Sequence, residues 1–349
     1  MSAATEHQAP TTAPTATAEK PILELRHVSK RFVKPLDAAA KIANLFGAGL
    51  RDEIVHAVDD VSLTIADGEV VGLVGESGCG KSTLGRVVAG VHPATKGEVL
   101  FRGRELSTQS SAEARDTALK VQMIFQDPMS SLNPRLRVQD IVGEAPKVHG
   151  LVDAKGSEEY VAEMLIRVGL DPTYARRYPH QFSGGQRQRI GIARALAVNP
   201  DFLVCDESVA ALDVSIQAQV LNLFMRLREE FHLTYLFISH DLGVVEHLSD
   251  RVVIMYLGRV VETAKTEDIF ESANHPYTQA LLAEVPRLDT RKRKFVPVKG
   301  EIPSPLNPPP GCHFHPRCPH AHERCRMEQP LLKEIAPGRF SACHLNDGA

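Results

Sequence analysis

The residues best suited to chemistry lie in a glycine-rich stretch, Gly75-Glu76-Ser77-Gly78-Cys79-Gly80-Lys81-Ser82-Thr83. Its glycines let the backbone curl so that several N–H groups point at one anion, and a helix N-terminus adds its positive dipole end. In such a loop Lys81 reaches the β- and γ-phosphates of a nucleotide and the Ser82 hydroxyl ligates Mg²⁺. The alternative is a chance match in an ordinary glycine turn.

The elements on either side of this stretch fit a phosphate-binding loop. The apolar run Val70–Val74 predicts a strand before it. A helix is predicted after it from apolar residues that share one helical face: Leu84, Val87, Val88 and Val91. A glycine-rich turn between a strand and a helix is the setting that phosphate binding requires.

Polar side chains also follow three other apolar stretches. Gln126 follows residues 121–125, Asp206 and Glu207 follow residues 202–205, and His240 comes soon after residues 235–238. Near-continuous apolar strands are typical of parallel sheets covered on both faces, and ligands bind at the carboxyl ends of such strands. We therefore expect these side chains at the sheet edge that carries the phosphate loop.

The chemistry of γ-phosphate hydrolysis assigns a role to each of these side chains. Asp206 suits Mg²⁺, through a bound water, and Glu207 is the candidate general base or water-orienting carboxylate. Gln126 can contact Mg²⁺ and the water with a neutral amide, and His240 can donate to the γ-phosphate. The alternative for Asp206 and Glu207 is that they cap the following helix.

A second anion-binding helix end is predicted at Phe182-Ser183-Gly184-Gly185-Gln186. Ser183 is placed to cap a helix that continues through residue 197, and the glycines let another molecule approach its N-terminus. Since this segment lies far downstream, in a stretch with a helical pattern, it need not reach the phosphate loop of its own chain.

Together these motifs resemble the nucleotide-binding subunits of ABC transporters, over roughly residues 22–290. The glycine-rich stretch resembles the Walker A loop, Gln126 the Q-loop, 182–186 the signature motif, 202–207 Walker B, 211–213 the D-loop and His240 the switch histidine. The resemblance implies an α/β P-loop ATPase fold with a mixed core sheet, an antiparallel β layer and a helical subdomain. It also implies a head-to-tail dimer that holds ATP between the Walker A loop of one subunit and the signature motif of the other.

The resemblance assigns ATP and Mg²⁺ to particular residues. Phe32 fits the aromatic that stacks on adenine, whereas its position alone allows either a base-stacking or a buried ring. The expected ATP contacts are Phe32, Gly75, Glu76, Ser77, Gly78, Cys79, Gly80, Lys81, Ser82, Thr83, Ser183, Gly184, Gly185, Gln186 and Asp213. The expected Mg²⁺ contacts are Ser82, Gln126 and Asp206, and the expected catalytic residues are Glu207, His240 and Gln126.

Finer motifs are similar to the dipeptide and oligopeptide importers, in particular their second ATPase subunit. These motifs lie at residues 125–128, 131–134, 213–219 and 275–278. The resemblance implies a different second ATPase subunit, two transmembrane permease subunits and a periplasmic or extracellular solute-binding protein. It also implies a peripheral location on the cytoplasmic face of the bacterial inner membrane. Nickel, glycosides and opines remain alternative cargoes.

A soluble ABC ATPase acting on DNA or ribosomes is the alternative from another class. The net charge of −3 gives no reason to expect a nucleic acid partner. No apolar run approaches the ~18 residues of a membrane span, and no secretory signal is visible.

The C-terminal segment carries four cysteines after a proline-rich arm at residues 303–319. They are Cys312, Cys318, Cys325 and Cys343. Four thiolates suit zinc or an iron–sulfur cluster, nearby histidines keep zinc open, and free thiols are the third alternative. The pattern at residues 311–319 resembles the tail of peptide-importer ATPases, in which such cysteines hold a [4Fe–4S] cluster, so the resemblance implies that cluster, in a structural role.

Composition and these motifs divide the 349 residues into three parts. Residues 1–20, rich in Ala, Thr and Pro, are expected to be a disordered tail. Residues 21–270 form the expected nucleotide-binding domain, with a helical subdomain at about 127–198 and a short amphipathic insertion within 33–56. Residues 271–349 form a small, irregular metal-binding extension. The isolated Cys79 and Cys205 are expected to fill tight space as small residues.

Overall fold

The near-continuous apolar stretches form neighbouring parallel strands in the computed structural model of the protein. β3 (Val70–Val74), β8 (Thr234–Ser239), β7 (Phe202–Asp206) and β6 (Val121–Ile124) follow one another in this order, each parallel to the next. Every residue of β3, β7 and β8 is buried. These strands have few polar side chains because both of their faces are covered. The predicted parallel core is therefore confirmed.

On the other side of β3, the same sheet continues with one more parallel strand and then becomes antiparallel. β9 (Arg251–Tyr256) still runs parallel to β3, and β10 (Arg259–Lys265) then turns back along β9. The last two strands are β12 (Arg339–Ser341) and β11 (Lys333–Ala336), which complete an eight-stranded sheet. Since Glu262 pairs with Ser341, strands of the C-terminal segment continue the core sheet.

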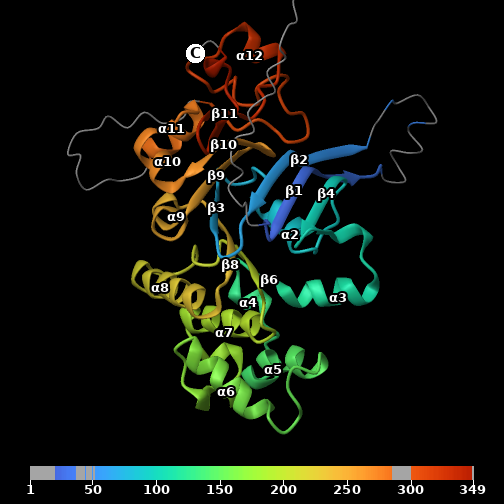
Figure 1. Cartoon of the computed structure of the whole chain (residues 1–349), viewed down its shortest axis with the longest axis vertical. Helices are drawn as coiled ribbons and strands as arrows, with labels where there is room; N and C mark the ends of the chain where they lie inside the picture. Colours follow the sequence, from blue (N-terminus) through green and yellow to red (C-terminus); the bar gives the residue numbers. More distant parts are fainter. Residues whose placement is uncertain (1–19, 37–43, 45–48, 50–51, 285–299, 348–349) are drawn as a thin grey trace, which may run out of the picture.

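A separate antiparallel sheet forms the predicted β layer. Its order is β2 (Glu53–Ile65), β1 (Leu23–Lys34), β4 (Lys96–Phe101) and β5 (Arg104–Glu105). Its buried side chains join one cluster with the helix after the phosphate loop, for example Leu25 and Val61 with Leu84. Figure 1 shows β1, β2 and β4 to the right of the core strands β3 and β9.

Eleven helices are defined among the described residues. They are α2 (Lys81–Val88), α3 (Ser111–Lys120), α4 (Pro128–Ser131), α5 (Val138–Val148), α6 (Ser157–Arg167), α7 (Gly184–Leu196), α8 (Val214–Phe231), α9 (Leu242–Leu248), α10 (Thr266–Ser272), α11 (Pro276–Ala283) and α12 (Glu323–Met327). Short 3-10 turns lie at Leu106–Thr108, Pro172–Arg176, Pro179–Gln181 and His344–Asn346.

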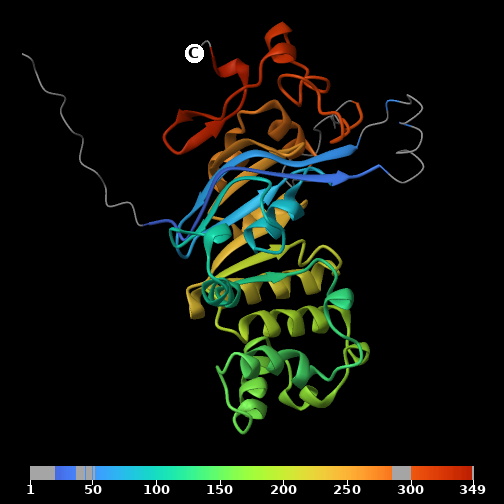
Figure 2. The ribbon, with the colours of Figure 1, turned by 90° about the vertical axis from the view of Figure 1, so that its right-hand side faces the viewer.

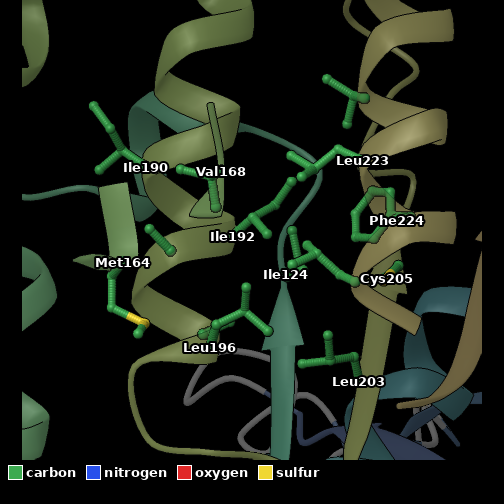
Figure 3. Close-up of a cluster of buried hydrophobic side chains, with 14 of the residues drawn as sticks. Ile124, Met164, Val168, Ile190, Ile192, Leu196, Leu203, Cys205, Leu223 and Phe224 are labelled. Carbon is green, nitrogen blue, oxygen red and sulfur yellow. The ribbon is translucent and has the colours of Figure 1, made fainter. Parts of the chain in front are cut away.

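The helices between β6 and β7 form a lobe of their own. Figures 1 and 2 show α5, α6 and α7 at one end of the molecule and the C-terminal segment with α12 at the other. Figure 3 shows how this lobe joins the sheet: Ile192 of α7 and Phe224 of α8 flank Ile124 of β6. A continuous apolar cluster therefore fixes the helical lobe, which ends with α7, relative to the edge of the sheet.

The helix after the phosphate loop is shorter than its apolar pattern predicts. α2 ends at Val88, and Val91 is 51% exposed instead of sharing the buried face, so that part of the prediction was wrong. Gly90, at φ 70°, stops the helix in a left-handed turn, and the Val91 N–H bonds back to the Arg86 carbonyl.

The structure describes residues 20–36, 44, 49, 52–284 and 300–347. The tail predicted at 1–20 lies outside the described residues except for Lys20, and so does most of the predicted insertion within 33–56.

Candidate nucleotide-binding site

The glycine-rich loop is packed tightly between β3 and α2. A Cβ atom on Gly75 would overlap the Met255 carbonyl oxygen, and one on Gly80 would overlap the Ala57 carbonyl oxygen. Gly80 also has φ 105°, which other residues rarely adopt. These two positions therefore require glycine if the loop is to lie against β9 and β2.

The side chain of Lys81 bonds to the backbone of its own glycine-rich loop. Its side chain is buried, and Nζ donates to the carbonyl oxygens of Gly75 at 2.7 Å and Glu76 at 2.9 Å. The ammonium group thus ties both ends of the turn together. When Lys81 binds phosphate, it must exchange or share these carbonyl contacts.

Ser82 and Asp206 lie side by side although 124 positions separate them. Ser82 Oγ donates to Asp206 Oδ1 at 2.7 Å. Asp206 is 2% exposed, and burial raises its pKa, while the Ser82 hydrogen bond partly opposes that shift. Mg²⁺ prefers oxygen ligands, and this pair offers a hydroxyl and a buried carboxylate at the end of the phosphate loop. The residues present therefore fit magnesium.

Glu207 is the centre of a second polar group. Gln126 Nε2 donates to Glu207 Oε2 at 2.7 Å, and His240 Nδ1 lies 3.5 Å from the same oxygen. Glu207 has φ 46°, a strained left-handed conformation for a residue that is not glycine. Since α8 begins only at Val214, Asp206 and Glu207 do not cap it, and that alternative is excluded.

The loop and the Glu207 group open into one cavity of about 320 Å³. The cavity is lined by Phe32, Val55, Ala57, Ser77, Gly78, Gly80, Lys81, Ser82, Thr83, Gln126, Glu207 and Pro305. Phe32 is 38% exposed there and meets the His92 ring edge-on, so it is not the fully buried aromatic that its position also allowed. A planar base beside Phe32 would place its phosphates toward the loop.

The predicted helix cap at Ser183 is confirmed, and this helix end lies outside the cavity, in line with the expectation that it need not reach the phosphate loop of its own chain. Ser183 caps α7: its Oγ accepts from the Gln186 N–H, and Gln186 Oε1 accepts from the Ser183 N–H. In the described part of the chain, the cavity is not lined by the residues of this helix end or by the predicted D-loop aspartate. These residues are Ser183, Gly184, Gly185, Gln186 and Asp213. A Cβ on Gly185 would overlap Ile216 of α8, which fixes this turn beside the D-loop.

The sequence analysis missed the cavity-lining Val55 and Ala57 and three residues from the C-terminal part of the chain. Pro305 lines the cavity, and its carbonyl accepts from the His56 N–H at 3.1 Å. Tyr277 and Arg317 both contact Glu76 of the phosphate loop. Each of these three lies far from the loop in sequence, and no local pattern predicts such contacts.

The four C-terminal cysteines are all free thiols. Burial, with smaller contributions from the nearby Cys325, Cys343 and Cys318, raises the pKa of Cys312 to about 11, so the four sulfurs share one neighbourhood. Among the described residues no group of three or more His, Cys, Asp or Glu side chains is arranged to hold a metal ion. The buried Cys79 and Cys205 pack in the core clusters, as expected.

The described helices include none that combines the length and the apolarity needed to cross a membrane.

Two family profiles match the chain. The profile "ABC transporter" matches residues 58–210, and the profile "Oligopeptide/dipeptide transporter, C-terminal region" matches residues 261–325.

Relatives of known name match over most of the chain. The oligopeptide transport ATP-binding protein AppF of Bacillus subtilis is 51% identical over 335 residues, which cover 95% of this chain and 99% of AppF. The dipeptide transport ATP-binding protein DppF of Haemophilus influenzae is 48% identical over 298 residues, covering 85% of this chain and 91% of DppF.

Solved structures match the fold. The dimeric post-hydrolysis state of the ATP-binding cassette MJ0796 with ADP and Pi has a TM-score of 0.59 and 28% identity, covering 70% of this chain and 98% of that one. The structure of cbiO1 from Clostridium perfringens has the same TM-score at 25% identity, covering 73% and 92%.

Proposed function

This chain belongs to the ABC transporter family as an ATP-hydrolysing subunit, and from that premise we propose that it powers the import of oligopeptides or dipeptides across a membrane. The observation that carries the proposal is the cavity that joins the phosphate loop to Glu207, in a chain whose C-terminal region matches the oligopeptide/dipeptide transporter profile. AppF and DppF are named for oligopeptide and dipeptide transport, which supports the cargo class.

The residues around the cavity divide the work of hydrolysis. Loop N–H groups and Lys81 bind the phosphates, and Ser82 and Asp206 would hold magnesium, which would neutralise phosphate charge. Glu207 orients the attacking water and accepts its proton. Gln126 holds the Glu207 carboxylate in place, and His240, beside it, donates to the γ-phosphate. Phe32 stacks on the base.

The partner half of the ATP site comes from a second ATPase subunit. Within one chain, Ser183, Gly184 and Gln186 form an anion-binding helix end that lines no part of the cavity in the described residues. A head-to-tail partner would bring its own helix end to the phosphates, and the solved structure of MJ0796 is described as dimeric. We propose that the partner is a different ATPase chain, which makes the pair a heterodimer.

The proposed transporter places this chain on the cytoplasmic face of the bacterial inner membrane, as a peripheral subunit. It docks there on two permease subunits, which receive peptide from a solute-binding protein. The proposed boundaries are a nucleotide-binding domain at 21–270, with its helical subdomain at about 127–198, and a C-terminal extension at 271–349. The helical lobe that ends in α7 supports this division.

The four C-terminal thiols are proposed to hold a [4Fe–4S] cluster. Their number suits the cluster, they are free, and their mutual effect on the pKa of Cys312 supports a shared neighbourhood. The Cys312 N–H also bonds to the Cys325 carbonyl at 2.9 Å, which holds two of the four residues together. The cluster would staple a segment with little apolar core of its own, and zinc is the alternative occupant.

Reconstitution of the complete transporter in liposomes tests the proposed function. Wild-type complex should take up labelled dipeptide or oligopeptide in an ATP-dependent way, and complex with Glu207→Gln should not. Uptake of nickel, a glycoside or an opine, with no uptake of peptide, would correct the cargo. ATP hydrolysis that responds to DNA or ribosomes but not to the permeases would refute the import function itself.

A further inference from the structure

Glu76, the second residue of the phosphate loop, is held at three points. Its N–H donates to the Tyr277 hydroxyl oxygen at 2.9 Å, and its carbonyl accepts from Lys81 Nζ at 2.9 Å. Its carboxylate receives both arms of the Arg317 guanidinium, at 2.7 Å and 2.8 Å. A fork of this kind is the strongest and most directional ion pair that side chains make.

Arg317 belongs to the C-terminal segment, 241 positions after Glu76. Its side chain is 5% exposed, and its guanidinium also donates to the Tyr256 hydroxyl at 3.4 Å. Removing such a group from water costs free energy that only a partner of opposite charge repays. The ion pair with the buried Arg317 guanidinium therefore fixes the position of the Glu76 carboxylate.

The platform under Arg317 is rigid. Tyr256 of β9, Tyr277 of α11 and Phe314 of the C-terminal segment pack ring against ring, with centroids 4.7 to 5.3 Å apart. All three side chains are at most 2% exposed. This aromatic cluster joins the sheet, a helix and the C-terminal segment, so Arg317 and the Tyr277 hydroxyl are presented to the loop in fixed positions.

We propose that Arg317 is a positioning residue of the ATP site, which holds Glu76 in place and neutralises its charge beside the bound phosphates. Without Arg317, the phosphate loop would carry a bare carboxylate one residue from the glycine whose carbonyl binds Lys81. That carboxylate would repel the triphosphate and would be free to draw Lys81 toward itself. The inference rests on the ATP site of the proposed function and assigns Arg317 no contact with the nucleotide.

The test is a double-mutant cycle read by ATP binding to the full-length chain, measured by calorimetry. Arg317→Met should weaken ATP binding about tenfold, and high salt should reduce the defect, since it screens the exposed carboxylate. Adding Glu76→Gln to Arg317→Met removes that carboxylate and should restore binding to within about threefold of wild type. Arg317→Lys, which keeps the charge without the fork, should fall between wild type and Arg317→Met.

Two further variants keep the test decisive. Lys333→Gln breaks an ion pair with Asp347 in the same C-terminal segment, away from the loop, and should bind ATP as wild type does. Tyr277→Phe removes the hydroxyl that accepts from the Glu76 N–H and should also weaken ATP binding. It takes the place of Arg317→Met if that variant does not fold, and unchanged binding by it would then overturn the inference.

Unchanged binding by a folded Arg317→Met would overturn the inference, and so would additive losses in the double variant. Failure of the wild-type chain itself to bind ATP would instead count against the proposed function. In the assembled transporter, Arg317→Met should raise the KM for ATP with little change in kcat, because the residue acts on binding and not on the water.

Discussion

The Ser82 hydroxyl donates to the Asp206 carboxylate at 2.7 Å and so joins the phosphate loop to the end of β7. Ser82 lies in the first turn of α2, which follows β3 and the phosphate loop. Asp206 ends β7, which is separated from β3 in the sheet by β8. The contact puts both proposed magnesium ligands within reach of one ion and gives the buried carboxylate a partner that partly offsets the cost of its burial.

Ser82→Ala should raise the Mg²⁺ concentration needed for half-maximal ATP hydrolysis about tenfold. The substitution removes one ligand and also the hydrogen bond that lowers the pKa of Asp206. The defect should therefore grow toward acid pH, where more of Asp206 is protonated. Ser107→Ala, at an exposed turn, is the matched control, and an unchanged magnesium requirement in Ser82→Ala would count against the assignment.

Glu207→Gln should retain ATP binding and lose about 100-fold or more in turnover. The amide keeps the shape of the side chain but cannot accept a proton from water. Calorimetry and phosphate release measure the two quantities separately. Glu230→Gln, the same change at the exposed end of α8, should hydrolyse ATP normally, and substantial hydrolysis by Glu207→Gln would refute the role of Glu207.

Ser183→Ala and Ser110→Ala form a matched pair, since each serine caps a helix in a reciprocal capping box. Each should cost about 1 kcal/mol of stability. Only Ser183→Ala should also weaken ATP-dependent association with the partner ATPase, because only that helix end is proposed to meet the partner's nucleotide. Sedimentation with and without ATP distinguishes the two variants, and equal association by both would contradict the proposed dimer geometry.

His275 should make the protein sensitive to acid. It is buried, its Nδ1 accepts from the Tyr277 N–H, and burial lowers its pKa from 6.5 to about 4. The unfolded chain takes up a proton at this residue before the folded chain does. The stability it contributes is therefore fully present above pH 6.5 and is lost as pH falls toward 4.

Comparison with His275→Asn isolates this effect, since asparagine can cap α11 but does not titrate. The stability advantage of wild type over His275→Asn should shrink by up to roughly 3 kcal/mol across that pH range. The exposed His149→Asn should show no such trend. Denaturant unfolding at several pH values measures the difference, and an advantage that does not change with pH would contradict the assignment.

Cys325→Ser should remove the proposed cluster. Protein purified without oxygen should contain about four irons and four sulfides per chain as wild type and fewer as Cys325→Ser, with loss of the broad visible absorption. Cys205→Ala, which removes a core thiol far from the tail in sequence, should keep its iron. Colourless wild-type protein that contains zinc, or no metal, would exclude the iron–sulfur assignment.

Local patterns in the sequence were sufficient for the strands, the phosphate loop and the capped start of α7. The apolar runs before Gly75, Gln126 and Asp206 became parallel strands of one sheet because such runs bury both faces. Ser183 and Gln186 form their capping box because the motif needs only residues within one turn. Each of these features depends on neighbours in the chain, so it could be predicted from the chain.

Contacts between distant segments were decided only by the tertiary structure. The pairing of Arg317 with Glu76 depends on Phe314 packing against Tyr256 and Tyr277, and no periodicity specifies the result. The same holds for Pro305 at the rim of the cavity. The sequence alone was enough to predict that Gly75–Thr83 binds nucleotide phosphates, since that prediction needs only spacing and residue type. Only the tertiary structure decided which residues hold the loop, because the buried Arg317 pairs with a carboxylate that is near it in space but distant in the sequence.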